Sequence, residues 1–116
     1  MNNNTYTVGS MFAGIGGICL GFKQAGFEIV WANEKDAAAC RTYRHNFGDK
    51  YLLEANIKKV NKQTIPVFDI LTAGFPCQPF SVAGPHKGFE DARGNLFFQI
   101  IEVAKIAQPK IIFLEN

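Results

Sequence analysis

Short apolar runs and amphipathic segments alternate along this chain, and that alternation is the feature that most constrains the fold. The apolar runs, typical of buried strands, lie at residues 6–12, 28–32, 51–53, 68–73 and 111–114. The amphipathic segments, typical of helices, lie at residues 17–25, 36–47, 58–63 and 95–108. Parallel strands are joined by crossover connections, which are usually helical. The pattern therefore predicts an α/β fold, in which helices cover both faces of a doubly wound parallel sheet.

Local signals predict where the helices begin and end. Asp36 is a favourable N-cap and Gly48 a favourable terminator for the second helix, and Asn95 is the expected N-cap of the last one. Pro109 cannot continue that last helix and ends it. One apolar stripe is expected along it: Phe97, Ile100, Ile101 and Ala104. The final apolar run is typical of a buried strand, but in the doubly wound order 3-2-1-4-5 it lies at an edge of the sheet, which is left uncovered where later segments are missing.

Composition bounds the size and the compartment. A chain of 116 residues with 47% hydrophobic content can bury one core but leaves no room for a second domain. The net charge is only +2, so any nucleic-acid site must be local. Cys19, Cys40 and Cys77 are odd in number and lack CxxC spacing, which disfavours disulfides and cysteine metal sites. No apolar run is long enough to span a membrane, so we expect a cytoplasmic protein. The spacing of the cysteines and histidines gives no reason to expect a metal.

A glycine-rich turn follows the first predicted strand and reads Phe12-Ala13-Gly14-Ile15-Gly16-Gly17. Glycines at such a turn let the backbone approach a ligand closely. Glu34 follows the second predicted strand, where a carboxylate can accept hydrogen bonds from ribose hydroxyls. Together they predict a site for an adenosine-containing cofactor. The alternative is a tight turn beside a solvated acid, and Cys19 departs from the dinucleotide fingerprint at its third small residue.

A cysteine between two prolines follows the fourth predicted strand, in the stretch Gly74-Phe75-Pro76-Cys77-Gln78-Pro79-Phe80-Ser81. The glycine and the prolines end the strand and leave Cys77 at its carboxyl end, where ligands bind in open α/β sheets. This placement favours an exposed, reactive thiol. The alternative is a buried structural cysteine in a proline-rich turn.

In order and spacing, these segments resemble the DNA cytosine-5 methyltransferases of bacterial restriction-modification systems. The resemblance also rests on Asn33-Glu34, on residues 88–97 (GFEDARGNLF) and on Glu115-Asn116, and it covers nearly the whole chain from about Val8. It implies the Rossmann-like doubly wound sheet of S-adenosylmethionine-dependent methyltransferases, truncated after the fifth strand, with S-adenosylmethionine as cofactor. Residues 1–116 are then the amino-terminal part of the catalytic and cofactor-binding domain, and the target recognition domain is absent.

The resemblance also implies a mechanism on double-stranded DNA. A Cys77 thiolate adds to carbon 6 of a cytosine, carbon 5 takes the methyl group, and loss of the carbon-5 proton releases the product. Glu115, in its protonated form, donates to ring nitrogen 3. The cytosine must be flipped out of the duplex to reach these groups.

Further site residues are implied by position. The cofactor contacts are Phe12, Ala13, Gly14, Gly16, Gly17, Glu34, Asn56, Ile57, Pro76 and Leu96. Asn56 stands where the family usually has an acid that receives the adenine amino group, and its carbonyl can accept the same hydrogen bond without a charge. The expected DNA contacts are Gln78, Ser81 and Arg93, in a loop whose composition suits a mobile lid.

The chain stops well before the end of a typical family member. The resemblance therefore places the later arginine motif and the recognition domain in the rest of a longer protein, or in a complementary chain of a split enzyme. We expect these 116 residues alone to be inactive. Two other interpretations are a noncatalytic remnant of the fold and a nucleotide-dependent oxidoreductase. The oxidoreductase leaves the Pro-Cys-Gln loop and Glu115 unexplained.

Overall fold

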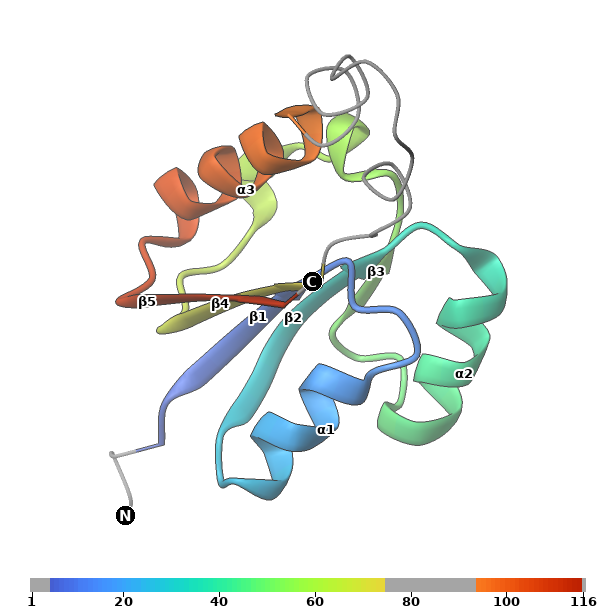
Figure 1. Ribbon diagram of the computed structural model, residues 1–116. Coiled ribbons are helices and arrows are strands. Elements are labelled where there is room, and N and C mark those ends of the chain that lie inside the picture. The colour runs from blue at the N-terminus through green and yellow to red at the C-terminus, as the bar shows by residue number, and fades with distance from the viewer. Residues whose placement is uncertain (1–4, 75–93, 116) are drawn as a thin grey trace, which may run out of the picture.

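The computed structural model describes residues 5–74 and 94–115, which form one five-stranded sheet with helices on both faces (Figure 1). The strands are β1 (Thr7–Met11), β2 (Glu28–Glu34), β3 (Leu52–Glu54), β4 (Ile70–Gly74) and β5 (Ile111–Glu115). The helices are α1 (Gly17–Gln24), α2 (Ala37–Phe47) and α3 (Gly94–Ala107), with the short 3-10 helices η1 (Ile57–Lys59) and η2 (Lys62–Thr64).

The sheet order is β3-β2-β1-β4-β5, and every pairing is parallel. From β1 the chain proceeds outward through β2 to β3, and then crosses to the other side of β1 for β4 and β5. This reversal confirms the predicted doubly wound fold. It also creates a switch point between β1 and β4, and ligands bind at the carboxyl ends of the strands beside such a point.

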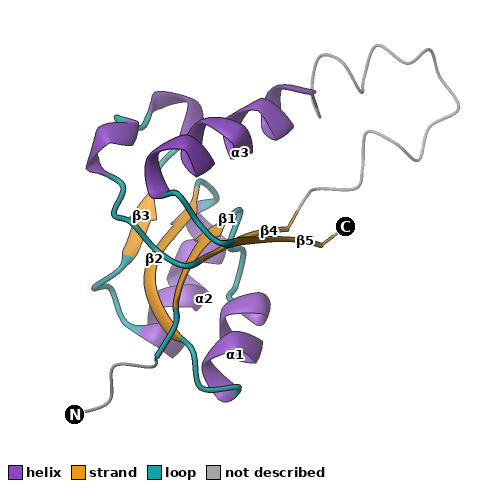
Figure 2. Ribbon diagram, turned by 90° about the vertical axis from the view of Figure 1, so that its left-hand side faces the viewer, coloured by secondary structure: helices purple, strands orange, loops and turns teal. Residues whose placement is uncertain are grey.

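Each face of the sheet has its own apolar core. Helices α1 and α2 cover one face, and α3 covers the other together with the two 3-10 helices (Figures 1 and 2). The core beneath α3 contains Met11, Trp31, Ile57, Ile65, Phe68, Leu71, Ala73, Ile100, Val103 and Ala107. The core on the opposite face contains Cys19, Ala32, Cys40, Tyr43 and Leu52. The sheet is therefore buried on both faces over its central strands.

The ends of α2 follow the predicted chemistry. The side chain of Asp36 accepts a hydrogen bond from the Ala39 amide at 2.8 Å, which confirms it as the N-cap. Gly48 ends the helix with a φ of 81°, a left-handed conformation that glycine adopts without strain.

The prediction for α3 was wrong in two details. The helix begins at Gly94, so Asn95 lies inside its first turn and is not the N-cap. Its fully buried positions are Ile100, Val103 and Ala107, whereas Phe97 and Ile101 of the predicted stripe are 46% and 42% exposed. Two sets of positions along α3 fit an apolar stripe, and only packing against the sheet decides which set is buried.

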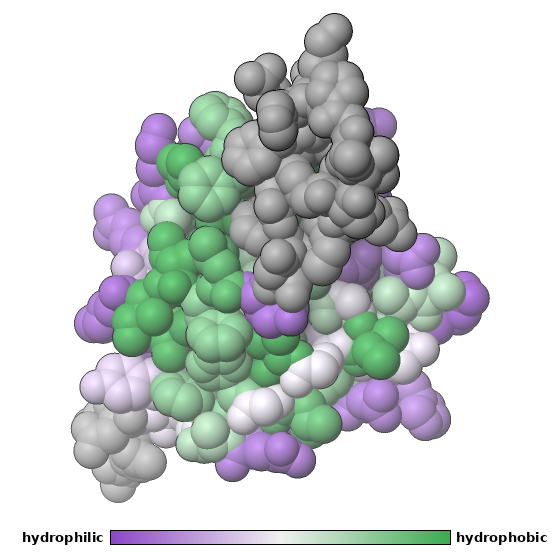
Figure 3. All heavy atoms as spheres, in the orientation of Figure 1, coloured by the Kyte–Doolittle hydropathy of each residue, from purple (hydrophilic) through white to green (hydrophobic). Residues whose placement is uncertain are grey.

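The description of the fifth strand as buried was wrong, whereas its expected place at an uncovered edge of a sheet in the order 3-2-1-4-5 is confirmed. Residues Ile111 to Leu114 are 43% to 58% exposed, because β5 is the edge strand of the sheet. Figure 3 shows hydrophobic side chains gathered over α3 and β5. The apolar run alone suggests burial, and it is the strand order that indicates an edge strand with one neighbour.

Candidate cofactor-binding site

A cavity of about 350 Å³ opens at the carboxyl ends of β1, β2, β3 and β4. Its described lining residues are Phe12, Asn33, Glu34, Lys35, Ala55, Asn56, Ile57, Lys58, Gly74 and Leu96. The predicted cofactor contacts Phe12, Glu34, Asn56, Ile57 and Leu96 are thus brought together around one space. Its volume falls at the lower end of the usual range for small-molecule sites, about 300–1,000 Å³.

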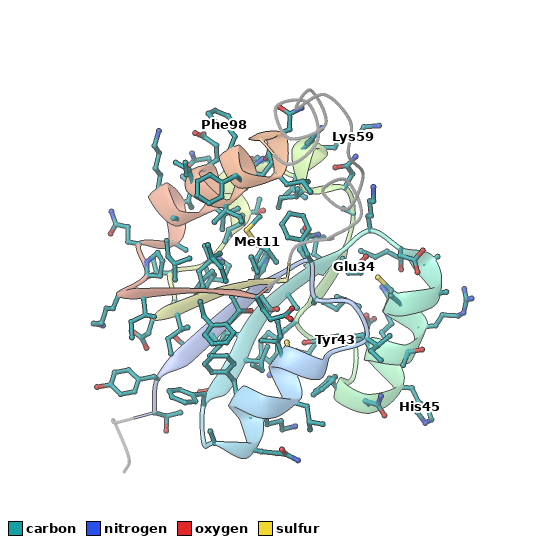
Figure 4. All side chains as sticks on the ribbon, in the orientation of Figure 1. Met11, Glu34, Tyr43, His45, Lys59 and Phe98 are labelled. Atoms are coloured by element: carbon teal, nitrogen blue, oxygen red, sulfur yellow. The ribbon has the colours of Figure 1, made fainter. Side chains whose placement is uncertain are left out.

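Glu34, at the end of β2, is fixed by backbone amides on both sides (Figure 4). One carboxylate oxygen, Oε1, accepts a hydrogen bond from the Gly14 amide at 2.9 Å, and Oε2 accepts one from the Asp36 amide at 3.0 Å. Each oxygen keeps a second lone pair. The carboxylate is therefore oriented in advance and can still accept hydrogen bonds from a ligand.

The glycine turn is built from left-handed residues. Phe12, Gly14 and Gly16 have φ angles of 54°, 61° and 103°. The turn is closed by hydrogen bonds from the Ala13 amide to the Asn33 carbonyl at 3.0 Å and from the Gly16 amide to the Ala13 carbonyl at 3.1 Å. Such a φ is costly for a residue with a side chain, about 1–3 kcal/mol. The turn thus holds Phe12 at the cavity in a conformation that phenylalanine rarely adopts.

The other glycines of the turn lie away from the cavity. Gly16 and Gly17 line a separate hollow between α1 and α2, together with Phe47. A Cβ on Gly16 would come within 2.3 Å of the Phe47 ring, so this position requires glycine for space as well as for φ. Ala13 and Gly14 are held at the cavity wall because their backbone amides donate hydrogen bonds to the Asn33 carbonyl and to the Glu34 carboxylate.

Asn33 is a site residue that the sequence reasoning did not single out. It lines the cavity, is 2% exposed, and donates from Nδ2 to the carbonyl oxygens of Leu53 at 2.8 Å and Ala55 at 3.0 Å. These hydrogen bonds tie the end of β2 to the segment that leaves β3. A polar residue at the end of an apolar strand was the available signal, but its partners are set by the fold.

The segment after β3 forms the far wall of the cavity. The Asn56 side chain caps η1, because its Oδ1 accepts a hydrogen bond from the Lys58 amide at 3.0 Å. The next residue, Ile57, is 4% exposed and anchors this turn in the core beneath α3. Lys35 and Lys58 also line the cavity and were not expected there.

Glu115 lies beside the end of β4 but does not line this cavity. It is paired with Gly74 across the two strands, and its Oε1 is 3.7 Å from the place where a Cβ on Gly74 would lie. Its side chain lines an apolar groove between α1 and β5, together with Phe22 and Phe113. Some predicted site residues lie outside the described residues: Pro76, Cys77, Gln78, Ser81 and Arg93.

The two described cysteines are buried and make local contacts. The Tyr43 hydroxyl (Figure 4) donates to Cys19 Sγ at 3.2 Å, and Cys40 Sγ donates to the Glu34 carbonyl at 3.4 Å. Burial raises the pKa of both thiols above the usual value of 9.0. Neither thiol is therefore suited to act as a nucleophile at neutral pH.

Within residues 5–74 and 94–115, no group of three or more histidine, cysteine and acidic side chains could hold a metal ion. None of the helices in that part of the chain is both long and apolar enough to span a membrane.

The sheet order and the cavity at its switch point define a doubly wound α/β protein with a candidate ligand site at the carboxyl ends of its strands. Residues 6–116 match the C-5 cytosine-specific DNA methylases, and the chain belongs to that family.

Relatives and solved structures agree with this assignment. The type II methyltransferase M.Bsp6I of Bacillus sp. (strain RFL6) is 50% identical over 94% of this chain and 35% of its own length. M.HhaI of Haemophilus parahaemolyticus is 50% identical over 91% of this chain and 32% of its own length. A crystal structure of a DNMT2 variant from Spodoptera frugiperda superposes with a TM-score of 0.62 at 31% identity, covering 85% of this chain and 31% of that one. The chain thus spans about a third of the length of the curated relatives it matches.

Proposed function

We propose that this chain carries the cofactor site and part of the catalytic site of a DNA cytosine-5 methyltransferase, which uses S-adenosylmethionine to methylate carbon 5 of a flipped cytosine. The observation that carries the proposal is the cavity, because Phe12, Glu34, Asn56, Ile57 and Leu96 all line it. Membership of the C-5 cytosine-specific family supports the substrate.

The chemistry of the cavity walls suits an adenosyl group. Glu34 offers lone pairs for ribose hydroxyls while backbone amides hold it in place. Ile57 and Leu96 offer apolar surface to a purine, and Phe12 offers an aromatic ring. When bound, S-adenosylmethionine supplies an electrophilic methyl group on its sulfonium.

The chain's own reactive residues act on the cytosine ring. A thiolate at Cys77 forms a bond to carbon 6, which makes carbon 5 nucleophilic. Glu115 holds a proton against ring nitrogen 3 and stabilises the negative charge that the addition brings to the ring. The pairing of Glu115 with Gly74, which closely precedes Cys77 in the sequence, supports this assignment.

We propose that activity needs the remainder of the protein, either in the same longer polypeptide or in a complementary chain. The exposed edge strand β5 and the exposed side chains of α3 support such an association, because unpaired edges and apolar patches favour binding. Double-stranded DNA is the other partner, with Gln78, Ser81 and Arg93 as phosphate or base contacts. The cytoplasm, where bacterial DNA lies, is the proposed location.

A covalent trap tests the catalytic assignment. The chain is combined with the remaining two thirds of M.Bsp6I and offered DNA that contains 5-fluorocytosine, in which fluorine replaces the carbon-5 proton, so that elimination cannot release the covalent adduct. A protein–DNA adduct should form with the unsubstituted chain and with the control Cys40→Ala, but not with Cys77→Ser. An adduct that persists in Cys77→Ser would exclude Cys77 as the nucleophile.

Titration calorimetry tests the cofactor assignment. We expect S-adenosylmethionine to bind this chain, because Glu34 and the glycine turn are present. The binding should be weak, because the chain spans only about a third of the length of its relatives. Nicotinamide dinucleotides should bind no better. Tight dinucleotide binding that is lost in Glu34→Ala would favour an oxidoreductase, and the absence of both binding and a trapped adduct would favour a noncatalytic remnant.

A further inference from the structure

Asn56 presents a hydrogen-bond donor at the wall of the cavity, beside an oxygen that already accepts one hydrogen bond. Its Oδ1 accepts the Lys58 amide at 3.0 Å, and because a backbone N–H can only donate, this contact identifies which end of the side-chain amide is the oxygen. In such a cap the oxygen faces the turn and the NH₂ group is directed away from it. Among the described residues, Nδ2 has no hydrogen-bond partner. The NH₂ donor of Asn56 is therefore available to a ligand, together with the one lone pair that Oδ1 retains.

The polarity of this side chain is held by its surroundings. Ile57 is buried in the core beneath α3 and fixes the turn that Asn56 caps. The same turn is tied to β2 through Ala55, whose carbonyl accepts from Asn33 at 3.0 Å and whose amide donates to the Glu34 carbonyl at 3.0 Å. Rotating the Asn56 amide by half a turn would place its NH₂ against the Lys58 N–H and lose the cap. The site therefore keeps a fixed donor at this wall.

We propose that Asn56 is a specificity-determining residue that makes this site tolerate 6-oxopurine nucleosides as well as adenosine. The inference rests on the proposed function, in which the cavity takes the adenosyl part of the cofactor. A donor in the wall needs an acceptor on the base: adenine offers a ring nitrogen, and hypoxanthine offers a ring nitrogen or its 6-oxo group. A wall acceptor would instead select the 6-amino group of adenine, and hypoxanthine would place an oxygen against it.

Asn56→Asp reverses the polarity and keeps the shape. A carboxylate can cap η1 with one oxygen as asparagine does, so the change is confined to the other end, where an acceptor replaces the NH₂ donor. Asn61→Asp is the matched control. Asn61 caps η2 in the same way, accepting the Gln63 amide at 3.1 Å, and it does not line the cavity.

The experiment compares S-adenosylhomocysteine with S-inosylhomocysteine, which differ at position 6 of the purine. Dissociation constants are measured by calorimetry for the unsubstituted chain, Asn56→Asp and Asn61→Asp, each checked by circular dichroism for an intact fold. Asn56→Ser, which keeps a capping oxygen without the NH₂ group, is the second variant. It should weaken both ligands by a similar factor.

The unsubstituted chain and Asn61→Asp should bind the two ligands within about threefold of each other, whereas Asn56→Asp should prefer the adenosyl ligand by about tenfold or more, as expected for one mispaired hydrogen bond to a charged group. The proposal would be overturned if the unsubstituted chain preferred the adenosyl ligand by more than tenfold. It would also be overturned if the ratio of the two dissociation constants were the same in Asn56→Asp as in the unsubstituted chain. If neither ligand binds the unsubstituted chain, the cofactor assignment within the proposed function is wrong.

Discussion

Replacing Asn33 by alanine should remove the two side-chain hydrogen bonds that join β2 to Leu53 and Ala55, here called the Asn33 clamp. Asn33 is 2% exposed, and its Nδ2 serves the carbonyl oxygens of Leu53 and Ala55. Leu53 and Ala55 are only partly buried, so water can replace the lost donor in part. Each buried carbonyl left without a partner costs about 1–3 kcal/mol. Because both carbonyls keep some access to water, we expect Asn33→Ala to lower the free energy of unfolding by about 1–3 kcal/mol, out of a typical total of roughly 5–15 kcal/mol.

Urea denaturation measures this loss, with Trp31 fluorescence as the probe. Trp31 is the chain's single tryptophan, is 6% exposed and lies in β2 with Asn33. Asn46→Ala, at an exposed position of α2, serves as the control and should change the free energy of unfolding by less than about 0.5 kcal/mol. If Asn33→Ala lost no more than this control, the clamp would contribute nothing and the reasoning would be refuted.

The isosteric variant Asn33→Asp adds a pH signature. It puts a carboxyl group against the two carbonyl oxygens, and burial there should raise the pKa of that group above its value in the unfolded chain. The folded variant then holds the proton more tightly than the unfolded one. Its stability relative to the unsubstituted chain should be greatest at about pH 4 and should fall as the pH rises toward 7. A deficit that does not change with pH would contradict this account.

Four further outcomes are expected. Hydrogen bonds from the Lys110 ammonium and the Thr7 amide lower the pKa of Asp69 below its usual 3.8. The stability that this carboxylate contributes is therefore present above pH 3.8 and is lost as the pH falls through the lowered pKa. Asp69→Asn should reduce the pH dependence of the free energy of unfolding in acid. Gln108 is exposed with a φ of 53°, and Gln108→Gly should raise the free energy of unfolding by about 1 kcal/mol in urea, where a loss would contradict the strain argument. In a Cys77→Ser background, the buried thiols of Cys19 and Cys40 should react with a disulfide reagent only after unfolding, and fast labelling of the native chain would show that they are accessible. Because β5 is an exposed apolar edge, the isolated chain should self-associate or melt at low temperature, and should have no methyltransferase activity alone; a stable monomer by sedimentation that methylates DNA unaided would refute this.

The sequence was sufficient to predict the elements and their order in the sheet, because each strand and helix carries its own periodicity and caps. Asp36 and Gly48 show this, since their roles depend on neighbours within a few residues. Phe12, Glu34 and Asn56 also meet as the strand order requires, since they lie at or just after the carboxyl ends of neighbouring parallel strands.

What the sequence did not reveal depends on contacts between distant segments. The role of Asn33 is set by carbonyl groups 20 and 22 residues away. The buried side of α3 follows from how the helix is rotated against the sheet. The direction of the Asn56 amide is decided by the turn that it caps.

The two backbone amides that donate to Glu34 can report whether the cavity is occupied. Gly14 precedes α1 and Asp36 caps α2, so one carboxylate contacts the entrances of both helices on the same face of the sheet. A ligand hydroxyl that shares this carboxylate draws electron density from both hydrogen bonds at once. The amide proton resonances of Gly14 and Asp36 should then move together in a nuclear magnetic resonance titration. Occupancy of the cavity can thus be followed from two peptide groups that need not touch the ligand.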